Sequence, residues 1–162
     1  MTKAAVLLVL LAAVCGCSRP LQPAEKEEAR RAGLELQSVM DMASSRQVRP
    51  IEFELCSSRL LESSHELLDR VAEVLLKHNR LKLIVAGHTD DSGSEAFNEQ
   101  LSLERAGAVK LYLVRKGVYP ESVKVYGYGS RVPALKDNSE KARALNRRVE
   151  FRITTRDWNT VY

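Results

Sequence analysis

The sequence is poor in the residues that build most metal and redox sites. Its 162 residues include only three histidines and three cysteines. His65, His78 and His88 share no i, i+4 pair and have no cysteine nearby in sequence, so each is expected to be a surface or loop histidine. The sequence therefore predicts no metal site, and it gives no motif for a cofactor.

Long apolar runs are also lacking. A membrane-spanning helix needs roughly 20 apolar residues, whereas the one run near the start extends only from Ala4 to Val14. It follows a single charged residue, Lys3, and this pattern is typical of a cleaved export signal.

Basic residues are numerous but dispersed. The sequence pI is about 9.0, yet lysines and arginines form no stripe and are not interleaved with aromatic residues. That distribution does not favour nucleic acid as a partner, and export from the cytoplasm argues in the same direction.

The apolar run closes on Val14-Cys15-Gly16-Cys17, which resembles the lipobox of bacterial lipoproteins. By that resemblance residues 1–16 are a signal peptide and Cys17 becomes the lipidated first residue. Cys15 departs from the small or hydroxyl residue usual at its position, and an ordinary secretory signal is the alternative. Ser18 follows in place of the aspartate that retains some lipoproteins at the inner membrane, so the outer membrane, facing the periplasm, is predicted.

Cys56 then has no partner for an intramolecular disulfide. An exposed free thiol in an oxidising compartment would form intermolecular disulfides, so Cys56 is predicted to be buried or shielded.

The rest of the chain divides into a tether, one domain and a tail. Residues 17–47 are expected to hold the lipidated cysteine, a leash and a charged spacer helix over about 24–42. The compact domain is predicted over 48–155, with a tail at 156–162. Within it, apolar residues alternate with polar ones, or recur at helical spacing, in the order βαβαβαβ. Strands are predicted near 51–55, 81–86, 123–126 and 149–153, and helices near 94–116 and 141–146. A further helix of about 15 residues is predicted to follow an S-x-x-E capping box at Ser63.

The longest predicted helix carries a charge on its apolar face. Leu101, Arg105, Val109 and Leu113 recur every four residues. Arginine keeps its charge, so on a core-facing stripe it requires an anionic partner or a ligand. An S-x-x-E capping box from Ser92 predicts the start of this helix, and Gly117 predicts its end.

Several motifs together resemble the OmpA-like peptidoglycan-binding domain, and with the lipobox the whole chain resembles the peptidoglycan-associated lipoproteins. The resemblance implies an α/β two-layer sandwich with helices on one face of a four-stranded mixed sheet. It covers about residues 51–155 and rests on these blocks: Gly87-His88-Thr89-Asp90, Asn98, Leu101-Ser102, Arg105-Ala106, Gly127-Tyr128-Gly129 and Asn146-Arg147-Arg148-Val149-Glu150.

The ligand implied by this resemblance is the diamino acid of the peptidoglycan stem, diaminopimelate or a relative. Its free end carries an ammonium and a carboxylate on one carbon. Asp90 matches the aspartate that takes the ammonium, and Arg105 matches the arginine whose planar fork holds the carboxylate. Asn98 and Ser92 are expected to add hydrogen bonds, with a second arginine from Arg147, favoured over Arg148. The implied protein is a non-catalytic tether between outer membrane and cell wall.

Three alternatives stay open from the sequence. Asp90 and Arg105 can form a purely structural ion pair. The main partner can be another envelope protein, as in the Tol system. Least favoured is a cell-wall hydrolase using His88 and Asp90, because no nucleophile with an orienting partner is evident.

Overall fold

The computed structural model describes residues 22–45, 47–79 and 81–154, which form three long helices layered on a mixed sheet and a short fourth helix. The predicted signal peptide, Cys17 and the 156–162 tail lie outside these residues. Within the described part of the chain, no helix is both long enough and apolar enough to cross a membrane.

The sheet has three strands in the described residues: β1 (Lys82–Gly87), β2 (Val123–Gly127) and β3 (Val149–Thr154), in the order β2-β1-β3. β1 runs parallel to β2, with Val85 opposite Val125, and antiparallel to β3, with Val85 opposite Phe151. The sheet is therefore mixed, as predicted, and β1 is its buried centre.

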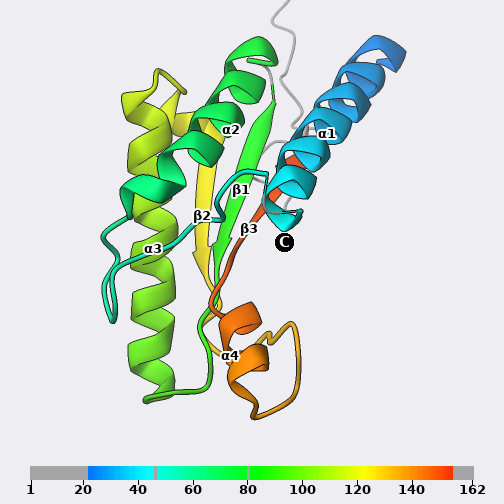
Figure 1. Ribbon diagram of the computed structural model, residues 1–162. Coiled ribbons are helices and arrows are strands. Elements are labelled where there is room, and N and C mark those ends of the chain that lie inside the picture. Colours follow the sequence, from blue (N-terminus) through cyan, green and yellow to red (C-terminus); the bar gives the residue numbers. More distant parts are fainter. Residues whose placement is uncertain (1–21, 46, 80, 155–162) are drawn as a thin grey trace, which may run out of the picture.

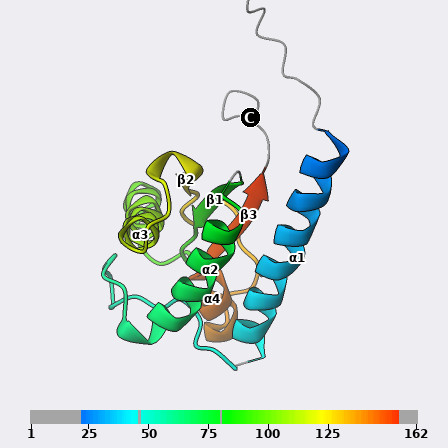
Figure 2. The ribbon, with the colours of Figure 1, turned by 90° about the horizontal axis from the view of Figure 1, so that it is seen from above.

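The long helices cover one face of this sheet. They are α1 (Pro23–Ser44), α2 (His65–Lys77) and α3 (Glu95–Arg115), and they lie side by side in Figure 2. The short α4 (Glu140–Asn146) lies at the end of the sheet where β1 and β2 finish (Figure 1). Single 3-10 turns, Glu62–Ser64 and Pro120–Ser122, precede α2 and β2. The predicted two-layer α/β architecture is confirmed.

The prediction of a fourth strand near 51–55 is wrong. This segment makes only an isolated antiparallel bridge, between Phe53 and Leu60. Its backbone bonds to its own return segment, because the Glu54 amide donates to Arg59 and the Leu61 amide donates to Glu52. The alternation of apolar and polar residues thus reflects a short folded-back loop, which packs Phe53 against the core.

Residue Cys56 lies at the tip of this loop and is exposed, so the prediction that it is buried is also wrong. Its φ of 50° is in the left-handed region, which turns the chain back on itself. A tight turn at the tip holds its side chain away from the core.

α3 begins and ends close to the predicted residues, although the N-cap is Ser94 and the capping box expected from Ser92 does not form. Ser94 is its N-cap and accepts a hydrogen bond from the Phe97 amide at 3.2 Å, while Gly117 follows the helix with a φ of 99°. The second predicted capping box, at Ser63, does not form. Instead the Ser64 hydroxyl accepts from the Glu52 amide at 2.8 Å and donates to the Glu52 carbonyl at 3.1 Å. Ser64 therefore fastens the 51–61 loop to the start of α2.

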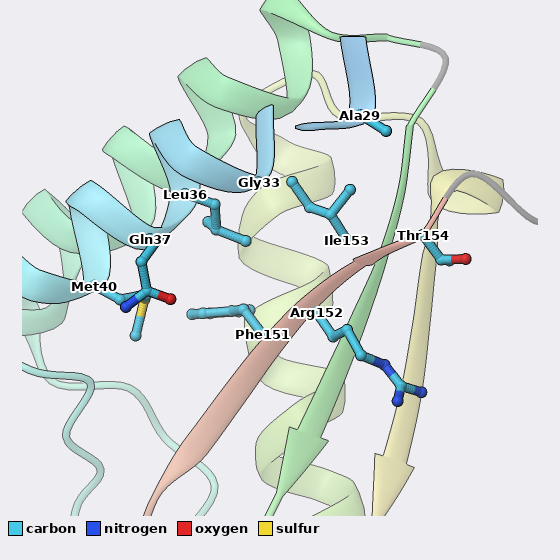
Figure 3. Close-up of a pocket in the computed structure, with 9 residues that line it drawn as sticks. All are labelled: Ala29, Gly33, Leu36, Gln37, Met40, Phe151, Arg152, Ile153 and Thr154. Carbon is cyan, nitrogen blue, oxygen red and sulfur yellow. The ribbon is translucent and has the colours of Figure 1, made fainter. Parts of the chain in front are cut away.

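The predicted spacer helix, α1, packs on the domain. Leu36 joins the hydrophobic core, and Glu35 pairs with Lys77 of α2 at 2.7 Å. Beside β3, α1 borders a cavity of about 390 Å³, into which Phe151 and Ile153 project (Figure 3).

Candidate functional site

The site begins where β1 ends. Gly87 packs directly on α3: an added Cβ would lie 2.1 Å from the Ser102 carbonyl oxygen, so only glycine fits here. The next three residues are buried although they are polar. The amide of His88 donates to the carbonyl of Arg148 at 2.9 Å, and that of Thr89 donates to Gly129 at 3.0 Å. These bonds hold the segment between the loops that follow β2 and precede β3, and they fix Asp90 at the end of the sheet.

The carboxylate of Asp90 is held on both oxygens. Oδ1 accepts from the Ser92 amide at 3.1 Å, and Oδ2 accepts from Nη1 of Arg147 at 2.7 Å. Burial raises the pKa of Asp90, but the bonds from Arg147 and Ser92 outweigh it and hold that pKa below its ordinary value. Asp90 is therefore an anion at neutral pH.

Two other residues that the sequence predicted for the site, Asn98 and Ser92, form hydrogen bonds with Asp90. Asn98 is buried and donates from Nδ2 to the Asp90 carbonyl at 3.3 Å. Ser92 is exposed and contributes its backbone amide. A direct ligand contact by either side chain stays a prediction.

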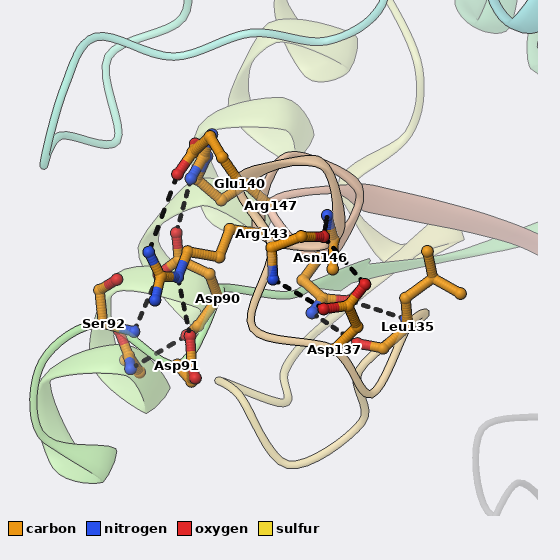
Figure 4. A network of polar contacts seen from close by, with 12 residues as sticks. Asp90, Asp91, Ser92, Leu135, Asp137, Glu140, Arg143, Asn146 and Arg147 are labelled. Atoms are coloured by element: carbon orange, nitrogen blue, oxygen red, sulfur yellow. Dashed lines mark hydrogen bonds and ion pairs between the residues drawn. The ribbon is translucent and has the colours of Figure 1, made fainter.

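Arg147 bridges two acidic residues. Besides Asp90, its Nη2 donates to Oε1 of Glu140 in α4 at 3.0 Å (Figure 4). These two carboxylates raise the pKa of Arg147. A neighbouring pair, Arg143 with Asp91 at 3.5 Å, adds to the same network. The contacts tie α4 to the segment that follows β1.

Arg105 is in a different environment. It lies on the inner stripe of α3, the residues Leu101, Arg105, Val109 and Leu113, and it is buried. Its Nε donates to the Ser57 carbonyl at 3.0 Å, and its guanidinium carbon lies 5.1 Å from the centroid of the Phe53 ring. Among the described residues it forms no ion pair, since the carboxylate of Asp90 is taken by Arg147. The structural Asp90–Arg105 pair considered from the sequence is thus not formed.

Burial lowers the pKa of Arg105, and nearby Arg147 adds to that effect, against the opposing fields of Cys56 and Asp90. Arginine nevertheless keeps its proton. The free-energy cost of burying its charge is only partly offset by the Ser57 carbonyl and the Phe53 ring. An anion bound beside Arg105 would therefore gain more than one bound to a solvated arginine.

The cavity in front of these residues has a volume of about 280 Å³ and is lined by Ile51, Glu52, Phe53, Leu61, His88, Arg105, Arg147 and Arg148. The 51–61 loop supplies its apolar wall, and α3 and the segment between α4 and β3 supply its cations. Asp90 stands behind Arg147. Asp90 is not one of the lining residues and is linked to the cavity through its ion pair with Arg147, and Glu52 is the acidic residue among those that line it.

Both arginines of the Arg147-Arg148 pair line the cavity, but they are held differently. Arg148 donates from Nε to Glu150 at 2.7 Å and from Nη2 to the Val132 carbonyl at 3.3 Å. The choice between them as ligand contacts stays a prediction. Arg147 has the direct link to Asp90.

The sequence did not reveal the residues that position Arg105. Phe53 and the Ser57 carbonyl come from the 51–61 loop, of which the sequence assigned residues 51–55 to a strand. Only the fold-back of that loop, through the Phe53–Leu60 bridge, brings them over α3. Within the described residues, no group of three or more acidic, histidine or cysteine side chains is arranged to hold a metal ion.

The sequence and the fold were compared with those of known proteins. Outer membrane protein A of Bordetella avium is 39% identical over 101 residues, 62% of this chain, and the chain spans about half (52%) of that protein's length. The peptidoglycan-associated lipoprotein of Pseudomonas aeruginosa is 32% identical over 161 residues, 93% of this chain and 95% of that one. The crystal structure of the peptidoglycan-associated lipoprotein from Burkholderia pseudomallei superimposes with a TM-score of 0.59 at 26% identity, over 65% of this chain and 87% of that one. The model of the OmpA family matches residues 52–147, and the chain belongs to this family.

Proposed function

We propose that this chain is a non-catalytic peptidoglycan-binding protein of the cell envelope, and that it grips the diamino acid of the peptide stem in the cavity at the end of β1. The observation that carries the proposal is Arg105, a buried guanidinium at a cavity wall with no carboxylate partner among the described residues. Asp90, also buried, lies at the same end of the sheet. One ligand with both charges would satisfy the two residues together.

The free end of a diamino acid carries those charges on one carbon. Its carboxylate would take the planar fork of Arg105, whose Nε is already fixed by the Ser57 carbonyl. Its ammonium would share the Asp90 carboxylate with Arg147. Phe53 would shield the guanidinium from water, which strengthens the bond between the two charges.

The names of two similar proteins support binding to the cell wall. The Pseudomonas and Burkholderia relatives are both named peptidoglycan-associated lipoproteins. We extend this to the present chain, with lipidation at Cys17 as its anchor in the outer membrane and the domain facing the periplasm. The chain then tethers the membrane to the wall, and a Tol-type envelope protein is a candidate second partner.

A hydrolase is the weaker alternative. Asp90 is engaged by Arg147, and neither ring nitrogen of His88 has a hydrogen-bond partner in the described structure. A general base needs a neighbour within hydrogen-bond reach that orients it or receives the proton. This pair does not have that arrangement.

Sedimentation with purified sacculi tests the proposal. The chain should pellet with sacculi and release no soluble fragments, and the Arg105→Lys variant should remain in the supernatant. Arg131→Lys is the matched control, because Arg131 pairs with Glu99 outside the cavity. A chain that stays in the supernatant would point to a partner protein, and released fragments would point to a hydrolase.

A further inference from the structure

The sheet has an open edge beside α1. β3 pairs with β1 on one side, and none of the described strands lies on its other side. The amide of His88 donates to the carbonyl of Arg148 at 2.9 Å, and this bond fixes the alternation along the antiparallel ladder of β1 and β3. By that alternation Arg152 turns its N–H and C=O toward β1, whereas Phe151 and Ile153 turn theirs to the open edge. Among the described residues, the backbones of Phe151 and Ile153 have no hydrogen-bond partner at this edge.

The cavity of about 390 Å³ between α1 and β3 borders this edge, and residues 151–154 line it on the β3 side. Figure 3 shows Phe151 and Ile153 directed toward α1, while Arg152 is directed away from it. Leu36 and Gly33 lie across the cavity on α1. A Cβ added at Gly33 would meet nothing within 4 Å, so the space beside the edge is not filled by the chain described here.

The chemistry of the edge specifies what can cover it. A row of N–H and C=O groups at one spacing is matched by another extended backbone, which adds as a further strand. The main-chain bonds provide affinity, and the side chains on the two faces decide which sequence fits.

The side chains of β3 specify that sequence. Successive residues of a strand point to opposite faces, so residues placed beside Phe151 and Ile153 would enter the cavity and should be apolar. The residue between them would lie beside Arg152 on the other face. Arg152 is exposed and forms no ion pair among the described residues, so an acidic neighbour is favoured there. The matching segment therefore alternates apolar and acidic residues.

A second copy of this chain fits the edge less well than a single segment. If β3 of two copies paired antiparallel, the two-fold axis would bring both α1 helices over the same cavity. A single extended segment brings no helix with it.

We propose that an extended segment of another protein, with alternating apolar and acidic residues, adds to the open edge of β3 and places its apolar side chains in the cavity beside α1. This cavity shares no lining residue with the one that contains Arg105, so both can be occupied at once. The association does not depend on the proposed binding to the cell wall.

A short labelled peptide in which valine and aspartate alternate is the probe, and fluorescence anisotropy with the full chain in detergent measures its binding. Two N-methylated forms test for an added strand, one methylated on the valine amides and the other on the aspartate amides. A strand bonds to β3 through only one of these sets, so one form should lose binding and the other should keep it. No binding of the unmethylated peptide, or an equal effect of the two methylations, would overturn the proposal.

Gly33→Leu tests the place of binding. Leucine is a better helix former than glycine, so α1 should be retained, while the new side chain fills the cavity and should lower peptide affinity about tenfold or more. Gly107→Leu is the matched control, because Gly107 is in α3, has nothing within 4 Å of an added Cβ, and does not line this cavity. Circular dichroism checks that both variants are folded, and sedimentation with sacculi should be unchanged by Gly33→Leu. Equal losses of peptide affinity, or none, would place the peptide elsewhere and refute the proposal.

Charge reversal tests the acidic positions. Arg152→Glu should lower affinity for the valine–aspartate peptide about fivefold and should raise affinity for a valine–lysine peptide. Arg115→Glu, at an exposed position at the end of α3, is the control and should do neither. Equal effects of the two substitutions would reflect the overall charge of the chain and would contradict a contact at Arg152.

A shortened chain tests whether the occupant comes from this protein itself. Deleting residues 155–162 should leave peptide affinity unchanged. Binding that appears only after the deletion would identify the chain's own tail as the occupant and would refute a strand from another protein.

Discussion

Arg147 holds Asp90 through a 2.7 Å ion pair between Nη1 and Oδ2, although 57 residues separate them in the chain. The pair joins the end of β1 to the segment that enters β3. It leaves Arg105, the other buried charge at this end of the sheet, with a backbone carbonyl and an aromatic ring as its partners. Because Asp90 is paired with Arg147, Arg105 is left without a carboxylate partner among the described residues, and this suits the cavity to an anionic ligand group.

This pair predicts an acid-sensitive contribution to stability. Because the pKa of Asp90 is lowered in the folded chain, its contribution is fully present above the unfolded value of about 4. It is lost as pH falls through the lower folded value. Arg147 is partly exposed, so Arg147→Gln should reduce the free energy of unfolding by only about 1 kcal/mol at pH 7.

The loss caused by Arg147→Gln should shrink as Asp90 becomes protonated, and urea unfolding at pH 7 and pH 2.5 measures it. Arg143→Gln is the control, since its ion pairs with Asp91 and Glu140 are longer, at 3.5 and 3.9 Å. A loss for Arg147→Gln that is equal at both pH values would exclude Asp90 as its source.

The fork of Arg105 predicts a specific binding defect. Arg105→Lys keeps the positive charge but cannot hold a carboxylate through two parallel bonds. Charge-assisted hydrogen bonds are worth about 1.5–3 kcal/mol, so affinity for a stem peptide should fall about tenfold to a hundredfold. Calorimetric titration measures this, with the unfolding free energy determined alongside.

A modified ligand distinguishes loss of the bidentate contact made by Arg105 from a general distortion of the site. A stem peptide with the carboxylate of the diamino acid amidated should bind the unmodified chain weakly. It should lose little more on Arg105→Lys, because the fork then has no anion to hold. If Arg105→Lys lowered the affinity for the amidated peptide as much as it lowers the affinity for the unmodified peptide, the substitution would be disturbing the cavity as a whole.

Local pattern in the sequence was sufficient for most of the fold. The stripe that contains Arg105 and Leu113 is continuous and long, and both ends of α3 carry strong cap signals. β1 is buried on both faces, so it appears as a short apolar run. These features are determined by neighbours in the chain, which is why they could be predicted.

The 51–61 loop could not be predicted because its conformation depends on residues that are distant in the chain. An alternating segment satisfies its backbone equally well in a sheet or in a fold-back, and the choice depends on distant contacts such as Ser64 with Glu52. The same holds for the partner of Asp90. The sequence singled out Asp90, Arg105 and Arg147, but only three-dimensional geometry shows that Asp90 pairs with Arg147.

The lipid anchor gives a prediction outside the described residues. Cys17→Ser should leave the chain unlipidated and free in the periplasm, because a lipid on Cys17 is the proposed membrane signal once the short apolar run is removed. Fractionation of cells measures this. A variant that still sediments with membranes would require an uncleaved helix or a protein tether.

Cys56 is expected to react rapidly with thiol reagents in the folded chain, because its side chain is exposed. Its backbone makes a second prediction, since a φ of 50° is unfavourable for any residue with a Cβ and most for a branched one. Cys56→Val should be less stable than Cys56→Gly by about 1–2 kcal/mol, as measured by urea unfolding. Slow labelling, or equal stabilities, would mean that the loop takes another conformation in solution.

The contact of Gly87 with α3 gives the sharpest test of how the fold positions the site. In Gly87→Ala the new methyl group would lie 2.1 Å from the Ser102 carbonyl oxygen, and neither backbone can move without separating β1 from α3. That separation would also pull Asp90 away from Arg105, so we expect a loss of at least about 2 kcal/mol in unfolding free energy, together with weaker binding to sacculi. Gly33→Ala is the matched control: the same methyl group is added in α1 with nothing within 4 Å, and it should stabilise the chain by about 0.5–1 kcal/mol without changing binding. If the two substitutions had the same effect on stability, close packing of β1 on α3 could not be what holds Asp90 and Arg105 in place.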